Sequence, residues 1–295
     1  MNKNSALTLT SIASLVIAPL AAGKSEPIGV IPFKLDGKLI LVEASINHSA
    51  PVTLVVDSGA SHSVLDPKFA EQLSLTVEKA APTTGTGAGD VAKSHASPVT
   101  ITLGALTVDV PQPWVIDLSK VPIPSAAKGL VGAELFKRYV VRMDPVQSTL
   151  SVFDPSSYHY EGTGASLPLN VDGDKLFLEA NLEVPAGKTV KHKLRIDTGS
   201  EGSVNDEIVK QSSEVRTSGG GGGLGNDSKS YSGLFTSVAL GPFTIKHVWG
   251  SGDPHPGIGM ELLRRFIITF DAPHGRLYLE PTPQLAEPVP TPPSE

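Results

Sequence analysis

The chain has 295 residues, 40% of them apolar, and its 24 basic and 30 acidic side chains leave a formal charge of −6. An acidic balance argues against a nucleic-acid-binding protein, which normally presents a basic face. The absence of cysteine excludes disulfides, thiolate zinc sites and cysteine nucleophiles. The 29 glycines and 25 prolines are typical of a soluble globular protein rich in turns.

Residues 1–23 have the pattern of a secretory signal peptide. One lysine precedes an apolar run that ends in small residues at Ala21, Ala22 and Gly23. The run is short and interrupted by Pro19, which makes it a poor membrane span. We therefore expect an exported protein, periplasmic or secreted, with no stable membrane span after cleavage; a retained N-terminal anchor is the alternative.

The first half of the chain, residues 24–160, is predicted to be mainly β-structure. Alternating apolar residues indicate strands, and glycine-containing turns separate them. Apolar residues at three- and four-residue spacing indicate one or two helical turns after Gly132. The predicted elements, in chain order, are a hairpin over 31–41, a strand over 54–56, strands over 99–106 around a glycine turn, the helical turns, and strands over 140–143 and 150–153.

The second half, residues 161–282, repeats this order. It contains a hairpin over 167–178, a strand over 194–196, strands over 235–245 around a glycine turn, helical turns after Gly259, and strands over 267–270 and 276–279. Three blocks match in sequence: IPFKLDG (31–37) with LPLNVDG (167–173), VVDSGASHSV (55–64) with RIDTGSEGSV (195–204), and GAELFKRYVVRMD (132–144) with GMELLRRFIITFD (259–271). Three matches in the same order indicate two homologous halves.

Residues 283–295 close the chain and are rich in proline. Proline lacks an amide donor and favours extended conformations, so we predict a disordered tail. The tail could also act as a spacer or as a ligand for a partner.

The strongest chemical signal is the pair of triplets that begin at Asp57 and Asp197. One such triplet is weak support, because an aspartate before a turn is common. Here both copies follow an apolar strand at the same place in a repeat, so pseudo-twofold symmetry can bring the two carboxyls together. Such a pair shares one proton. The ionised carboxyl can then activate a water while the protonated one donates to a peptide carbonyl.

These residues resemble the aspartic peptidases of the pepsin and retropepsin type over residues 28–281, and the helix-strand endings resemble single-lobe retropepsin-like proteins of bacteria. The resemblance implies an all-β, two-lobed fold in which each lobe is a retropepsin-like barrel with one short helix. It implies that Asp57 and Asp197 form a catalytic dyad. It assigns supporting roles to Ser58, Gly59, Thr198, Gly199 and Ser200.

The segment 83–89 is predicted to form a glycine-rich flap over a bound peptide, with Gly85, Gly87 and Gly89 contacting the substrate. It lacks the tyrosine that pepsins carry on this flap. The matching segment 217–227 contains five consecutive glycines and could be a second flap or a linker.

Other candidate residues are assigned structural roles. His62, five residues after Asp57, is expected on the strand that leaves the catalytic loop. Asp144 and Asp271 are expected to cap turns, and the histidines show no metal-ligand spacing.

The sequence therefore predicts a monomeric aspartic endopeptidase that acts on a peptide or protein substrate and needs no metal or organic cofactor. We also predict an acidic pH optimum, because the dyad must hold one proton. The alternative is a catalytically inactive protein of the same fold that binds peptides or envelope components.

Overall fold

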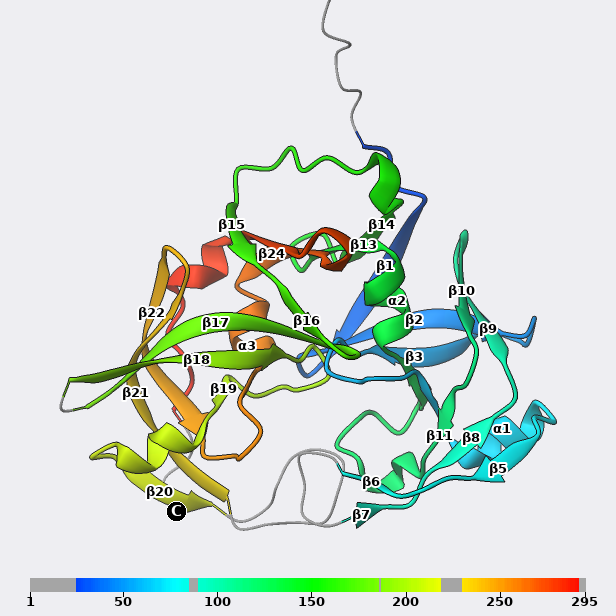
Figure 1. Ribbon diagram of the computed structural model, residues 1–295, viewed down its shortest axis with the longest axis horizontal. Coiled ribbons are helices and arrows are strands. Elements are labelled where there is room, and N and C mark those ends of the chain that lie inside the picture. The colour runs from blue at the N-terminus through cyan, green and yellow to red at the C-terminus, as the bar shows by residue number, and fades with distance from the viewer. Residues whose placement is uncertain (1–24, 85–89, 186, 219–229, 292–295) are drawn as a thin grey trace, which may run out of the picture.

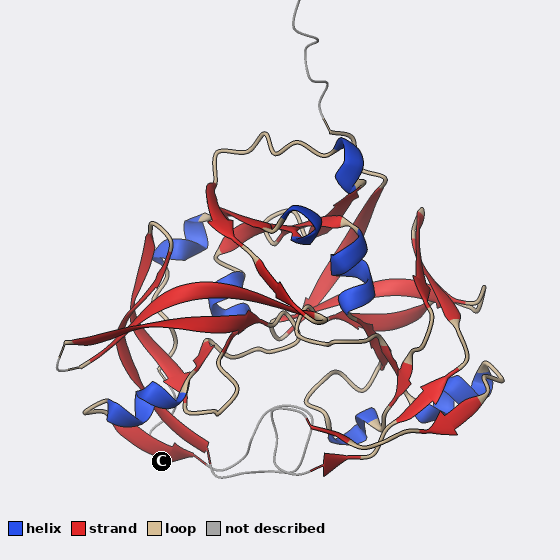
Figure 2. Ribbon diagram, in the orientation of Figure 1, coloured by secondary structure: helices blue, strands red, loops and turns tan. Residues whose placement is uncertain are grey.

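The computed structural model describes residues 25–84, 90–185, 187–218 and 230–291 (Figure 1). These residues form an all-β, retropepsin-like fold in which strands predominate and the helices are short (Figure 2). The predicted signal peptide, the flap glycines Gly85, Gly87 and Gly89, and the glycine run at 219–223 lie outside the described residues. No helix in the described ranges is long and apolar enough to cross a membrane.

The first half carries the elements up to residue 160. They are β1 (Gly29–Asp36), β2 (Leu39–Ile46), β3 (Val52–Val56), β4 (Val64–Leu65), α1 (Pro67–Gln72), β5 (Val77–Lys79), β6 (Thr83–Thr84), β7 (Asp90–Val91), β8 (Ser94–Ala96), β9 (Val99–Leu103), β10 (Leu106–Val110), β11 (Trp114–Val115), η1 (Leu118–Lys120), β12 (Ala127–Val131), α2 (Ala133–Arg138), β13 (Val140–Asp144), β14 (Thr149–Phe153) and η2 (Pro155–Ser157).

The second half repeats much of this order. Its elements are β15 (Ala165–Pro168), β16 (Asn170–Asp172), β17 (Lys175–Val184), β18 (Lys188–Ile196), β19 (Val204–Asn205), η3 (Glu207–Gln211), β20 (Val215–Ser218), β21 (Ser230–Leu240), β22 (Phe243–Ser251), β23 (Gly257–Ile258), α3 (Met260–Leu263), β24 (Phe266–Asp271), η4 (Ala272–His274), β25 (Arg276–Pro281) and η5 (Pro283–Ala286).

The predicted hairpins form in both halves. β1 pairs with β2 and β16 pairs with β17, each around an Asp-Gly turn. Gly37 and Gly173 have φ angles of 58° and 59°, which explains why glycine follows the aspartate at each turn. The helical turns predicted after Gly132 and Gly259 are α2 and α3.

A sheet shared by the two halves joins them (Figure 1). At its centre β13 pairs antiparallel with β24, with β14 and β1 on one side and β25 and β15 on the other. Arg142 lies directly opposite Thr269, its equivalent in the repeat. Equivalent residues can pair in this way only where they flank a twofold axis, so the sequence repeat is a spatial pseudo-symmetry.

Each triplet lies at the end of a strand that is held from two sides. β3 pairs with parallel β12, which also pairs with antiparallel β4, the strand that follows the first triplet. In the second half β18, β23 and β19 repeat this arrangement. A continuous cluster of buried apolar side chains extends through both halves, and Phe136 contacts Phe270 edge-on with ring centroids 5.1 Å apart. The triplets therefore sit on rigid, buried supports.

Residues 283–291 are packed on the second half, which differs from the disordered tail that the prolines predict. Pro283–Ala286 form η5, and Val289 is buried. The fully buried Arg265 donates to the backbone carbonyls of Gln284, Glu287 and Pro288. A proline-rich segment lacks amide donors but keeps every carbonyl, which suits a guanidinium that can only donate. Residues 292–295 lie outside the described residues.

Candidate active site

The two triplets meet where the halves pack together. Asp57 follows β3 and its amide donates to the Val131 carbonyl (3.0 Å). Asp197 follows β18 and its amide donates to the Ile258 carbonyl, also at 3.0 Å. Each aspartate is thus anchored by the strand that lies parallel to its own.

Ser58 and Thr198 bind each other's loops reciprocally. The Ser58 amide donates to the Thr198 hydroxyl (2.9 Å), and the Thr198 amide donates to the Ser58 hydroxyl (3.1 Å). Each hydroxyl then donates to a strand carbonyl of the opposite half, Ser58 to Ile196 and Thr198 to Val56. Both side chains are buried. These hydrogen bonds therefore join the two loops across the halves.

Gly59 and Gly199 lie against the opposite aspartate. A methyl group built on Gly59 would lie 2.5 Å from Cγ of Asp197, and one built on Gly199 would lie 2.4 Å from Cγ of Asp57. Real Cβ atoms do not approach that closely, so only glycine fits at either position. The loops therefore bring the two carboxyls to the same point on the pseudo-twofold axis.

Different partners surround the two carboxyls. Asp57 Oδ1 accepts from the amides of Gly59 (2.8 Å) and Ala60 (3.0 Å). Asp197 Oδ1 accepts from the Gly199 amide (3.1 Å), and its Oδ2 accepts from Nη2 of Arg195 at 2.7 Å. An ion pair to a guanidinium favours the ionised carboxylate. The site is therefore asymmetric, with a fixed cation beside Asp197.

The environment of Asp57 favours its protonated form. Burial raises the pKa of Asp57 to about 7, and the negative charge of Asp197 acts in the same direction. The charge of Arg195 and the amides of Gly59 and Ala60 oppose this rise. At neutral pH the Asp57 carboxyl can therefore retain its proton.

Ser200 lies in the second loop, but its hydroxyl accepts from the Gly202 amide (3.3 Å), within its own turn. Its backbone carbonyl accepts from the Met260 amide (2.7 Å), which ties the loop to α3. Ser200 therefore supports the loop through its backbone.

The arms of the predicted flap are described, although its tip is not. β6 and β7 pair antiparallel. In the second half, β20 and the start of β21 pair antiparallel on either side of residues 219–229, which are outside the described ranges.

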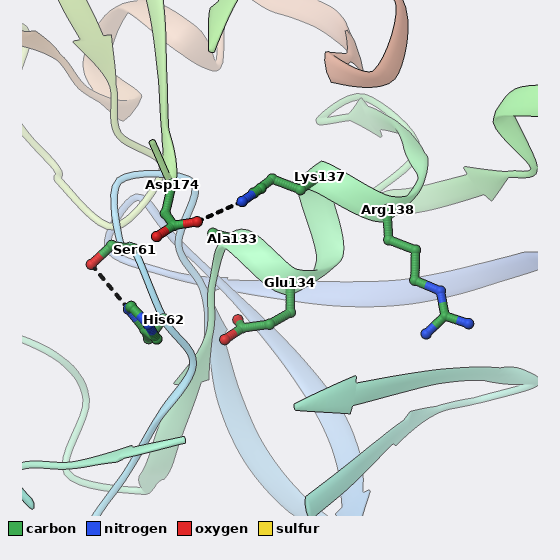
Figure 3. Close-up of a pocket in the computed structure, with 7 residues that line it drawn as sticks. All are labelled: Ser61, His62, Ala133, Glu134, Lys137, Arg138 and Asp174. Carbon is green, nitrogen blue, oxygen red and sulfur yellow. Dashed lines mark hydrogen bonds and ion pairs between the residues drawn. The ribbon is translucent and has the colours of Figure 1, made fainter. Parts of the chain in front are cut away.

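His62 lies in the pocket shown in Figure 3, between the end of the Asp57 loop and α2. Its ring stacks on Trp114 with centroids 4.4 Å apart. Nearby, Glu134 accepts from the amide (2.9 Å) and hydroxyl (2.8 Å) of Ser63. These side chains therefore stabilise the end of the Asp57 loop against its neighbours, Trp114 and α2.

Asp144 and Asp271 cap turns, as expected. Asp144 Oδ1 accepts from the amides of Val146 and Gln147, and Asp271 Oδ1 accepts from the amide of His274.

Sequence reasoning missed Arg195, the residue that most distinguishes the two carboxyls. The sequence contains a signal for it, because in the matched blocks VVD and RID Arg195 is the equivalent of Val55. The shared apolar pattern predicts the two strands, whereas the asymmetry of the site lies in this difference between them.

Comparison with protein families gives a match in the first half. Residues 42–135 match the aspartyl protease family, and the matched segment contains Asp57, Ser58 and Gly59. No curated protein matched the chain. The first half is therefore similar to aspartyl proteases, which supports an aspartic protease family and aspartic protease activity in general.

Proposed function

We propose that this protein is a monomeric aspartic endopeptidase in which Asp57 and Asp197 act on a bound water. The observation that carries the proposal is the reciprocal packing of the two loops, where Gly59 abuts Asp197 and Gly199 abuts Asp57. The family match in the first half supports the same chemistry. Export is part of the proposal and is supported by the pattern of residues 1–23.

The asymmetry of the site suggests the role of each carboxyl. Asp197, ion-paired with Arg195, is the base that takes a proton from the water as its oxygen attacks the peptide carbonyl carbon. Asp57 is the acid that donates its proton to the carbonyl oxygen, giving a tetrahedral diol. Collapse of the diol breaks the C–N bond as Asp197 gives its proton to the leaving amine and Asp57 takes a proton back from a diol hydroxyl.

The test is cleavage of a randomised peptide library from pH 3 to 8, with Asp57→Asn and Asp197→Asn beside the parent. We expect the parent to cleave and both variants to lose at least a hundredfold in rate. We also expect inhibition by a statine-type transition-state analogue. A folded parent that cleaves nothing across this range, or an Asn variant that matches it, overturns the proposal.

The second candidate is a peptide-binding protein without catalysis. It is favoured by the ion pair between Arg195 and Asp197, because a bound guanidinium competes with water for the base. Peptide binding by a parent that does not cleave would support this candidate. Cleavage that depends on both aspartates would eliminate it.

A further inference from the structure

The two sides of the candidate active site differ most at one pair of equivalent residues. Val55 in β3 and Arg195 in β18 each lie two residues before an aspartate, on the same face of their strand as that aspartate. Their cross-strand partners are Leu41 and Phe177. The repeat therefore places a valine on one side of the two carboxyls and an arginine on the other.

The side formed by the first half is apolar. Val55 belongs to a cluster of buried residues with Val64, Ile116, Leu118, Ala127 and Leu130. Ala60, next to the first triplet, packs against this cluster. A group bound beside Asp57 therefore meets hydrocarbon.

The side formed by the second half is cationic. Arg195 is held by Asp197 through Nη2, while its Nε has no hydrogen-bond partner among the described residues. The side chain keeps 13% of its surface exposed. Gly257 stands beside Arg195 where the first half has Leu130 beside Val55. The strand neighbour of Arg195 therefore adds no side chain to this side.

Lys175 adds a second cation to this side. It lies in β17, two residues before Phe177, where the first half has Leu39. Burial lowers the pKa of Lys175, and the charge of Arg195 lowers it further, whereas the charge of Asp197 opposes the shift. Because Phe177 pairs with Arg195, Lys175 lies on the same face, level with the end of β18 from which Asp197 follows.

The charges on this face do not balance. On the same face of β17 and β18, Lys191 pairs with Glu179 and Lys193 pairs with Asp172. Arg195 pairs with the carboxylate of Asp197, whereas Lys175 forms no ion pair with any described residue. A peptide that covers the site removes water from both cations, and this is unfavourable unless it brings a negative charge.

We propose that Arg195, assisted by Lys175, selects substrates that have a Glu or Asp side chain beside the scissile bond. This acidic side chain lies on the side of the second half, and an apolar side chain lies on the side of the first half. This inference rests on the proposed function, whose substrate class it specifies. The carboxylate accepts from the guanidinium edge that Asp197 leaves free. Arg195 is then a specificity-determining residue as well as the partner of Asp197.

The test uses decapeptides with identical flanks and a central Leu-X or X-Leu pair, where X is Glu, Gln or Lys. For the parent we expect kcat/KM to rank Glu above Gln by about tenfold or more in one of the two orders, and Lys last. The preference falls as salt is raised, because the contact is ionic. Equal kcat/KM values for Glu and Gln peptides in both orders overturn the inference. This comparison is made on the parent protein alone.

Two variants locate the effect. Arg195→Met, which keeps the length of the side chain without its charge, is expected to reduce the Glu-to-Gln preference at least fivefold. The matched control is Lys191→Met, which removes one charge from the same strand in an exposed pair and is expected to keep the preference of the parent. A preference that survives in Arg195→Met, or that Lys191→Met also loses, contradicts the assignment.

Binding to Asp57→Asn separates this inference from the proposed function. Calorimetry with the same peptides measures selection without cleavage. If the parent cleaves nothing but Glu peptides bind more tightly than Gln peptides, and this difference depends on Arg195, the peptidase is overturned and the acidic selection is supported. Cleavage by the parent without any Glu preference in rate or binding supports the peptidase and overturns the selection.

Discussion

Lys38 and Asp174 occupy equivalent positions after the two Asp-Gly turns, and each crosses to the helix of the opposite half. Lys38 forms an ion pair with Glu261 in α3 (3.1 Å), and Asp174 forms one with Lys137 in α2 at 2.6 Å (Figure 3). The charges are inverted between the two contacts. The halves are therefore clamped twice, once through each hairpin.

The two clamps differ in burial, which predicts different effects on stability. The Glu261 side chain is 5% exposed, whereas both side chains of the Lys137 pair are at least 40% exposed. We expect Lys38→Met to lower the free energy of unfolding by about 1 kcal/mol and Asp174→Asn by less than about 0.5 kcal/mol. Urea denaturation measures both. A larger loss for Asp174→Asn would show that burial does not govern these contacts.

Removing the C-terminal tail tests whether it is part of the fold. A chain ending at Thr282 leaves the buried Arg265 without its carbonyl partners in residues 284–288. We expect the free energy of unfolding to fall by about 1–3 kcal/mol, since the guanidinium keeps its ion pair with Glu261 but loses its carbonyl acceptors in the tail. A chain ending at Thr291 is the control and is expected to match the parent. Equal urea midpoints for all three chains would favour the disordered tail.

The repeat predicts which residues meet at the axis, because a pseudo-twofold places equivalent loops together whatever the surrounding detail. It therefore anticipates the aspartates, the glycines and the crossed hydrogen bonds of Ser58 and Thr198. It cannot anticipate departures from symmetry. The contact of Arg195 with Asp197 depends on one difference within a matched block. The docking of the tail depends on the burial of Arg265, whose equivalent Arg138 is exposed and pairs with Asp109.

The raised pKa of Asp57 predicts an unusual dependence of stability on pH. The unfolded chain releases this proton near pH 4, whereas the folded chain keeps it to about 7. Between these values the folded state holds more protons, so this group favours folding less and less as pH rises. We expect Asp57→Asn to be more stable than the parent at pH 7, by on the order of 1 kcal/mol or more, and equal to it near pH 4.

Thermal or urea unfolding from pH 4 to 8 measures this difference. The control is Asp36→Asn, at an exposed aspartate in β1, which should run parallel to the parent. If the free energies of unfolding of the parent and of Asp57→Asn change in parallel with pH, the folded site does not retain the Asp57 proton.

The close contact between each glycine and the opposite carboxyl predicts a large effect of one methyl group. In Gly59→Ala the new Cβ falls 2.5 Å from Cγ of Asp197, so the loop or the carboxyl must move. Because a displacement of about 1 Å can cost a hundredfold in rate, we expect peptide cleavage to fall at least that far and stability to fall by about 1–3 kcal/mol. The control is Gly29→Ala, whose nearest contact would be Leu106 Cβ at 3.5 Å. We expect it to retain the parent's kcat/KM and urea midpoint. If Gly59→Ala cleaves as fast as Gly29→Ala, the close approach of Gly59 to Asp197 is not needed for cleavage.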